Sequence, residues 1–166
     1  MVRNFTKHYG KLIVLLIIIG LTAGCTQKMK HTEHINEALK VMKADAAKLG
    51  EAKLVADTLF FGATKINNNF EIVDALNEKF GCSATFFMKK GNDFIRVSTG
   101  IMKDDQSAVG TKLDPTGPVI KLLEKGLPYF GVADVLGKQY EAGYEPIKTA
   151  DGKIIGAYFV GFRIIQ

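Results

Sequence analysis

The sequence is poor in the residue types that build disulfide frameworks, thiol active sites and metal centres. Its 166 residues include two cysteines, Cys25 and Cys82, and three histidines, His8, His31 and His34. All three histidines lie early in the chain, so we expect no base beside Cys82 and interpret this thiol as a small buried residue. His31 and His34 fall near the start of a predicted helix, where exposed polar side chains are usual. This scarcity argues against a disulfide scaffold, a catalytic thiol and a metal site.

The signature motifs of common enzyme classes are also missing. No glycine-rich phosphate loop, HExxH zinc motif, CxxC pair or GxSxG nucleophile elbow occurs in the chain. Asp104 and Asp105 are adjacent carboxylates, but they lack the spacing of a calcium-binding loop. We therefore expect a protein that is not an enzyme and has no cofactor.

Clustered positive charge is absent as well. The chain carries 22 Lys and Arg residues against 17 Asp and Glu residues, a net charge of +5. Three of the basic residues, Arg3, Lys7 and Lys11, precede residue 25, which leaves 19 basic against 17 acidic residues in the remainder. No basic block follows, so a nucleic-acid partner is not expected.

What the chain does have is a targeting segment at its beginning. A basic opening is followed by LIVLLIIIGLTAG, an uncharged run of 13 residues that is shorter than the ~20 residues needed to span a bilayer. The run ends in LTAGC, which resembles a bacterial lipobox, although Thr22 stands where a leucine is usual. We expect residues 1–24 to be a lipoprotein signal peptide, Cys25 to be lipidated, and residues 25–31 to form a tether. A conventional signal peptide and an uncleaved anchor are the alternatives.

The rest of the chain, residues 32–166, has the pattern of one α+β domain. Apolar residues recur every three or four positions from Thr32 to Gly50, which predicts a long helix. TLFFGATKI indicates a short strand or an extended segment. Shorter helices are predicted in NNNFEIVDALNEKFG and DPTGPVIKLLEKG, and strands in SATFFMKK, DFIRVSTG and three segments after Leu127. We expect an antiparallel sheet of about five strands, with the long helix on one face and the short helix and loops on the other.

Five stretches, in their order and spacing, match a known pattern: NNNFEIVDAL, ATFF, FIRVSTG followed by AVGTKLD, GKQYEAGYEPI and DGKIIGAYFVGF. They make residues 50–166 resemble a single Cache sensor domain of the Cache3/Cache2 fusion type. Such domains occur outside the membrane in bacterial methyl-accepting chemotaxis receptors and sensor kinases. The resemblance implies a PAS-like fold with a small ligand, such as a short carboxylate, between the sheet and the overlying loops.

Arg96 is the first candidate for an anion contact in such a site. Its guanidinium is a planar fork that matches a carboxylate, and the resemblance places its strand beside the pocket. Strand alternation puts Ser98 on the same face, where its hydroxyl would donate to the ligand. An edge-strand arginine that points into solvent is the alternative.

A second wall of the site is predicted in GKQYEAGYEP. Alternation places Lys138, Tyr140 and Tyr144 on one strand face, where a cation and two phenols would suit an acid. Tyr129, in LPYFG, would close the pocket from the loop side. Either Tyr140 or Tyr144 could instead be a core aromatic.

These expectations combine into one function with one alternative. The chain would be an extracytoplasmic, membrane-anchored sensor of a small organic acid. Because it stops at Gln166 without an output module, it would report to a membrane sensor kinase or chemoreceptor. The alternative is a ligand-free module, derived from a truncated receptor, that forms homodimers along its N-terminal helix.

Overall fold

A computed structural model describes residues 30–165, which form three helices and ten strands. The helices are α1 (Thr32–Leu49), α2 (Glu71–Phe80) and α3 (Pro118–Glu124). The strands in chain order are β1 (Ala52–Val55), β2 (Thr58–Phe61), β3 (Thr64–Lys65), β4 (Ser83–Lys90), β5 (Asp93–Thr99), β6 (Met102–Lys103), β7 (Gln106–Ser107), β8 (Tyr129–Val135), β9 (Lys138–Lys148) and β10 (Ile154–Arg163). The predicted signal peptide and the predicted lipidation of Cys25 lie outside the described residues.

Helix α1 forms where its apolar periodicity predicts it. Ile35, Leu39 and Met42 recur at three- and four-residue spacing and are buried in the core. Gly50 follows the last helical residue with a φ of 123°, a conformation that residues with side chains rarely adopt. The predicted long helix is confirmed at both ends.

Local hydrogen bonding and backbone geometry set the bounds of α2 and α3. The side-chain oxygen of Asn69 accepts the N–H of Glu71 at 3.1 Å, which satisfies one of the free N–H groups at the start of α2. Gly81 ends α2 in the left-handed conformation, with a φ of 66°. Pro118 is the first residue of α3, where its missing N–H removes no helical hydrogen bond.

The main sheet has five antiparallel strands, as predicted, and their order is β5-β4-β10-β9-β8. Strands β1, β2 and β3 form a second, small sheet, where the sequence predicts only one short strand or an extended segment. Strands β6 and β7 pair with each other inside the loop that follows β5. The five-stranded sheet therefore carries the architecture, and the small sheet extends it beyond the end of α1.

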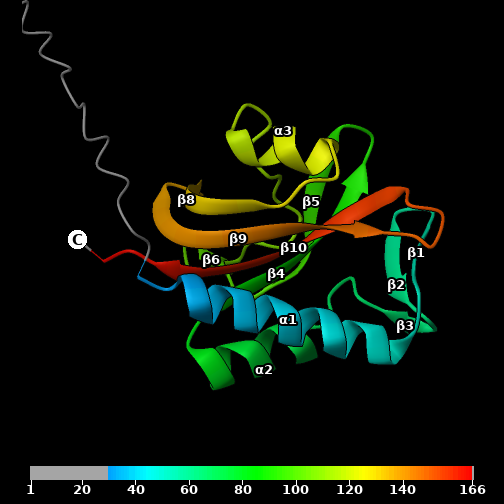
Figure 1. The fold of residues 1–166 in the computed structure, drawn as a ribbon, viewed down its shortest axis with the longest axis horizontal. Coiled ribbons are helices and arrows are strands. Elements are labelled where there is room, and N and C mark those ends of the chain that lie inside the picture. Colours follow the sequence, from blue (N-terminus) through cyan, green and yellow to red (C-terminus); the bar gives the residue numbers. More distant parts are fainter. Residues whose placement is uncertain (1–29, 166) are drawn as a thin grey trace, which may run out of the picture.

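The main sheet separates two layers (Figure 1). Helices α1 and α2 pack against one face, which we call the helix side, and α3 with the loop after β5 covers the other, which we call the loop side. Each side has its own apolar core: Phe86 and Tyr158 belong to the helix side, and Phe87 and Phe159 to the loop side. The predicted distribution of helices and loops over the two faces is confirmed.

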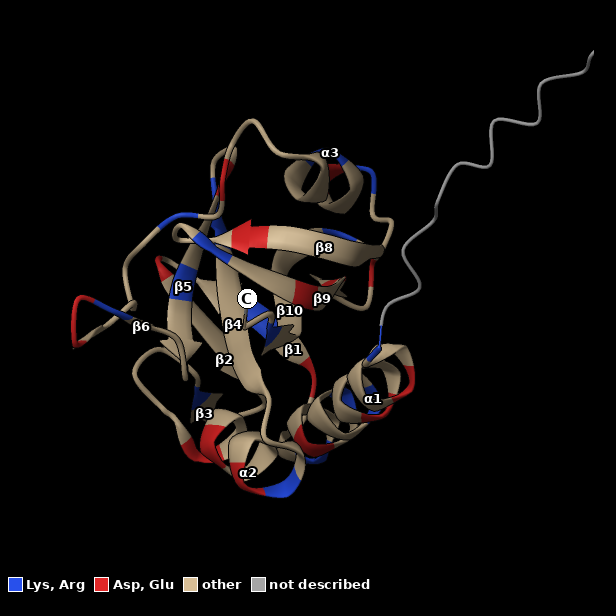
Figure 2. Cartoon of the chain, turned by 90° about the vertical axis from the view of Figure 1, so that its left-hand side faces the viewer, with Lys and Arg blue, Asp and Glu red and all other residues tan. Residues whose placement is uncertain are grey.

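Helices α1 and α2 carry both acidic and basic residues (Figure 2). Lys43 Nζ on α1 lies 2.5 Å from Glu145 Oε2 on β9, so an ion pair adds to the apolar contacts that fix α1 on the sheet. Among residues 30–165, no helix is both long enough and apolar enough to cross a membrane.

Strand β5 contains a bulge that changes which of its residues share a face. Arg96 pairs with Phe87 of β4, whereas Ser98 pairs with Phe86, so one extra residue lies between the two pairs. Residues directly opposite each other in a sheet share a face, and Phe86 and Phe87 belong to opposite sides. The Ser98 hydroxyl accordingly donates to the Asn69 carbonyl at 2.6 Å, beside α2. The prediction that Ser98 shares a face with Arg96 is wrong, because alternation is broken by the bulge.

The outer edge of β5 is covered by the loop that follows it. Arg96 donates its N–H to the Thr111 carbonyl at 2.9 Å and accepts the N–H of Gly110 at 2.8 Å. Leu113 donates its N–H to the Phe94 carbonyl at 2.9 Å. These bonds satisfy the backbone groups of an edge strand and hold residues 110–113 beside Arg96.

Candidate ligand-binding site

Arg96 is buried under this loop and does not point into solvent. The residue is 3% exposed. Its Nη1 donates to the Thr111 hydroxyl at 3.0 Å and to the Lys112 carbonyl at 3.1 Å. The guanidinium carbon lies 4.9 Å from the centroid of the Phe87 ring, a cation–π contact. The loop and the ring thus hold the guanidinium on the loop side of the sheet.

Two buried side-chain atoms on this side have no hydrogen-bond partner among the described residues: Arg96 Nε and the Tyr144 hydroxyl. A buried polar group without a partner costs about 1–3 kcal/mol, and native structures keep few of them. Both groups can donate, so an anion that accepts from both would recover this free energy.

Tyr144 stands at the centre of an aromatic cluster. It is fully buried, and its ring centroid lies 4.8 Å from that of Phe159, 6.1 Å from that of Tyr129 and 6.3 Å from that of Phe87. Because Phe87 also contacts the guanidinium of Arg96, the cation and the phenol belong to one continuous cluster. Apolar side chains from α3 and the loop after β5 complete the layer: Ile101, Leu113, Val119, Ile120 and Leu123.

Burial determines how this cluster ionises. It lowers the pKa of Arg96, and electrostatic interactions with Tyr144 and Tyr140 oppose that shift. An arginine pKa is so high that the guanidinium nevertheless stays charged at neutral pH. Burial also raises the pKa of Tyr144, an effect that Arg96 partly offsets. At neutral pH the cluster therefore offers one cation and one neutral hydroxyl donor.

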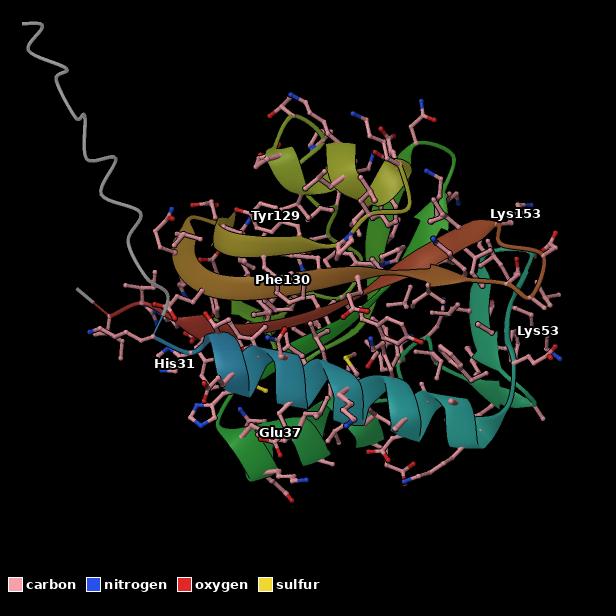
Figure 3. All side chains as sticks on the ribbon, viewed as in Figure 1. His31, Glu37, Lys53, Tyr129, Phe130 and Lys153 are labelled. Carbon is pink, nitrogen blue, oxygen red and sulfur yellow. The ribbon has the colours of Figure 1, made fainter. Side chains whose placement is uncertain are left out.

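Tyr140 and Tyr129 lie on the same side of the sheet as Tyr144. Tyr140 is buried, and its ring meets that of Phe159 edge-on with centroids 6.2 Å apart. Tyr129 lies on β8 (Figure 3), directly opposite Tyr144 on β9, and its hydroxyl donates to the Val132 carbonyl at 2.6 Å. The fold thus brings all three predicted tyrosines onto the face that Arg96 occupies.

Lys138 is not brought to this cluster. It is the first residue of β9, it is exposed, and it borders a surface hollow with Arg163 and Ile165. Along an extended strand, the distance from Lys138 to Tyr144 is about 20 Å, which exceeds the length of a small acid. Lys138 therefore lies too far along β9 to contact the same small ligand as Tyr144.

Thr111 and Lys112 contact Arg96 without having been predicted from the sequence. The Thr111 hydroxyl accepts from the guanidinium and donates to the Ala108 carbonyl at 2.7 Å, while Lys112 contributes only its backbone carbonyl. A backbone acceptor leaves no trace in a residue pattern. The one available signal is position, because both residues lie in AVGTKLD, which is separated by seven residues from the stretch that contains Arg96. Phe87 is buried in the core and its ring also contacts the guanidinium.

Comparison with protein-family models matches residues 24–166 to the Cache 3/Cache 2 fusion domain. The chain belongs to this family. A search of curated proteins found no match. The family match spans the whole described fold, and the helix-covered antiparallel sheet agrees with it, so the Cache resemblance and the PAS-like α+β fold predicted from the sequence are both confirmed.

Membership in this family indicates the general function of the domain that contains the cluster of Arg96 and Tyr144, which we call the loop-side cluster. Cache domains are extracytoplasmic, non-enzymatic modules that sense small molecules and sit in signalling receptors. The general function, location and kind of partner predicted for this Cache domain are confirmed at that level.

In the part of the chain between residues 30 and 165, no three His, Cys, Asp or Glu side chains gather as a metal site requires.

Proposed function

We propose that this Cache domain senses a small organic acid whose carboxylate binds Arg96 and the Tyr144 hydroxyl. The observation that carries the proposal is the pair of buried donors without partners in one cluster. A carboxylate has two oxygens that accept such bonds, and a charge-assisted bond to a guanidinium is about twice as strong as a neutral one. Tyr140 and Tyr129 would border the remaining atoms of the ligand.

The surroundings of Arg96 favour a small ligand that the loop encloses. Helix α3 and residues 108–113 cover the cluster, so entry requires this cover to move. Thr111 and Lys112 already bond the guanidinium, so a change in its position would be passed directly to the loop. Ligand binding would therefore exchange some of these contacts for contacts to the carboxylate.

Strand β9 offers a route from the site to α1. Tyr144 faces the loop side, and the adjacent Gly143 faces α1 so closely that a Cβ there would lie 2.6 Å from Ile35 Cγ2 and 2.7 Å from Leu39 Cδ1. Tightly packed interfaces transmit displacement because they have no free volume to absorb it. A shift of β9 on binding would therefore displace α1, the element that follows the proposed tether.

Isothermal titration of the full-length chain in lipid nanodiscs tests the proposal, with acetate, propionate, lactate, pyruvate and malate as probes. We expect at least one acid to bind and Arg96→Met to weaken its binding about 100-fold, the effect of losing a buried charged contact. Arg96→Lys should recover only part of the affinity, because an ammonium lacks the planar fork.

Arg163→Met is the matched control, since Arg163 is exposed at the end of β10. This variant should bind as the wild type does, and unfolding curves should show that all variants fold. Absence of binding by every acid, or wild-type affinity in Arg96→Met, would contradict the anion site.

We further propose that Cys25 carries a lipid anchor and that the domain reports to a membrane sensor kinase or chemoreceptor. LTAGC supports the anchor, and the place of Cache domains in receptors supports the partner. Metabolic labelling with palmitate should be lost in Cys25→Ala and kept in Cys82→Ala, because Cys82 is buried. Labelling that persists in Cys25→Ala would rule out this anchor.

A further inference from the structure

A cavity of about 230 Å³ lies on the helix side, between the end of α1 and the beginning of α2. We call it the helix-side cavity. Its apolar lining residues are Leu49, Ile72 and Ala75, which solvent reaches, and Phe86 and Ile66, which are buried. The main sheet separates it from Arg96, because Phe86 belongs to the helix-side core.

The volume and the apolar lining of this cavity fit a small organic molecule. In another protein, an apolar cavity of about 150 Å³ takes up benzene. The helix-side cavity is larger and therefore has room for one ring with a short side chain. Leu49, Ile72 and Ala75, which are partly or fully exposed, supply the apolar surface against which such a ring can pack.

The charged residues at the cavity select the polar end of such a molecule. Lys48 Nζ lies 2.7 Å from Asp45 Oδ1, so these two charges compensate each other. Glu71, in the first turn of α2, also lines the cavity, and its carboxylate has no ion-pair partner among the described residues. The ionisable residues that line the cavity, Asp45, Lys48 and Glu71, therefore carry a net negative charge beside its apolar lining.

We propose that the helix-side cavity is a second binding site, which takes a small organic amine with its apolar body against Leu49 and Ile72 and its ammonium at Glu71. This site is independent of the proposed acid site. The two sites lie on opposite faces of the sheet and have opposite charge preference, since Glu71 attracts a cation and Arg96 an anion. One domain would thus respond to two chemically distinct ligands.

Three probes with the same ring and different polar ends test this site by isothermal titration of the full-length chain in nanodiscs. They are 2-phenylethylamine, 2-phenylethanol and phenylacetate, with empty nanodiscs to subtract partition into lipid. We expect the amine to bind more tightly than the alcohol in the wild type. Glu71→Gln should weaken the amine about three- to five-fold and leave the alcohol unchanged, the effect of one partly exposed ion pair.

Ala75→Leu fills the cavity from an exposed helix position and should abolish binding of the amine without loss of stability. Ala47→Leu is the matched control, because Ala47 is exposed on α1 outside this cavity and should bind as the wild type does. Tyr144→Phe should also leave amine binding unchanged, which separates this site from the loop-side cluster.

The proposal is overturned if Ala75→Leu binds the amine as tightly as Ala47→Leu does. It is equally overturned if phenylacetate binds as tightly as the amine and loses that binding in Ala75→Leu, since the site would then not select a cation. Neither outcome affects the acid site, whose test depends on Arg96.

Discussion

At the scale of single residues, this Cache domain gathers its unmet hydrogen-bonding capacity in one cluster. Arg96 Nε and the Tyr144 hydroxyl are the buried side-chain atoms without partners between residues 30 and 165. In a low-dielectric interior, a polar group that lacks one bond raises the free energy of the folded state. In the proposed complex, both atoms would donate to the anion, so ligand binding would remove this unfavourable contribution.

Tyr144→Phe tests this trade between stability and binding. Removing the hydroxyl leaves the ring contacts in place and eliminates an unsatisfied group, so we expect the empty protein to be more stable by about 1 kcal/mol. The same change should weaken the best acid ligand about five-fold, because one neutral hydrogen bond is lost. Urea denaturation and titration measure the two effects, with Tyr129→Phe as a control whose hydroxyl has a partner, the Val132 carbonyl. A variant that loses stability would show that the hydroxyl is already satisfied.

The strand faces of the candidate site residues were predictable from the sequence wherever strand alternation is uninterrupted. Arg96 and the tyrosines on β9 occupy the expected face, because period-two geometry fixes the faces of an uninterrupted strand. The predicted face of Ser98 is wrong because a bulge inserts one residue into β5, and the side-chain pattern of the sequence does not indicate this bulge. Lys138 lies on the expected face of β9, but six residues before Tyr144, and alternation gives no information on such distances.

At the scale of elements, α1 is fixed to the sheet from its first turn. Glu141 Oε2 on β9 accepts the His31 N–H at 2.8 Å and lies 3.0 Å from His31 Nδ1, just before α1 begins (Figure 3). The His31 ring also stacks on Phe162 of β10 with centroids 4.5 Å apart. The start of α1 is therefore attached to two adjacent strands of the sheet, β9 and β10.

Glu141→Gln tests this attachment through its pH dependence. Burial alone would raise the pKa of Glu141, but hydrogen bonds from the backbone of Lys30 and His31 and from the His31 ring lower it. Because the folded pKa lies below the ordinary value of about 4.5, the carboxylate stabilises the fold above that pH, and this contribution disappears as the pH falls.

We expect Glu141→Gln to reduce the free energy of unfolding by about 1 kcal/mol at pH 7, and the difference from the wild type to shrink below pH 4.5. Urea denaturation between pH 3 and pH 7 measures both. Glu37→Gln, at an exposed position of α1, is the control and should match the wild type throughout. A difference that stays constant with pH would contradict the charged attachment.

Gly156 tests how closely β10 and β4 are packed. A Cβ at Gly156 would lie 2.1 Å from the Phe87 carbonyl oxygen, which is backbone and has no room to move aside. We expect Gly156→Ala to lower the free energy of unfolding by about 2–3 kcal/mol, the usual effect of overpacking a core. Gly100→Ala is the control, because a Cβ there meets nothing within 4 Å, and its urea midpoint should be unchanged. Equal midpoints for the two variants would show that β10 can shift to accommodate the methyl group.

At the scale of the whole molecule, one sheet serves two apolar cores, and each core contains a tyrosine that burial keeps neutral. Burial raises the pKa of Tyr144 on the loop side, partly offset by Arg96, and of Tyr158 on the helix side, where Glu145 adds to the shift. Burial likewise raises the pKa of the Cys82 thiol to about 11, an effect that a backbone hydrogen bond opposes. All three groups ionise more readily in the unfolded chain.

The fold should therefore lose stability at alkaline pH. A raised folded pKa stabilises the protein below the unfolded pKa, and this contribution is lost as the pH rises toward the folded value. The loss should begin near pH 9 with Cys82, worth about 2 kcal/mol by pH 11, and steepen above pH 10 with the tyrosines. Cys82→Ala should remove the part that begins at pH 9, as measured by urea denaturation from pH 7 to pH 11. An identical decline in Cys82→Ala would assign the loss to other groups.

The overall architecture was predictable because its signals are local. The apolar period of α1, Gly50, Gly81 and the hairpin between β4 and β5 each fix a boundary within a few residues of sequence. The small sheet of β1, β2 and β3 has strands of four residues or fewer, too short for alternation to distinguish them from extended coil. The fold-back of residues 110–113 depends on backbone hydrogen bonds, which the sequence does not encode in side chains.

The hydrogen bonds between β5 and residues 110–113 have a kinetic consequence. The backbone N–H groups of Arg96, Gly110 and Leu113 each donate a hydrogen bond between β5 and the loop. Their exchange with deuterated solvent therefore requires the loop to move away from the strand. An enclosed ligand would slow that movement. The exchange rates of these three amide protons would therefore report how often the loop opens, without any attached label.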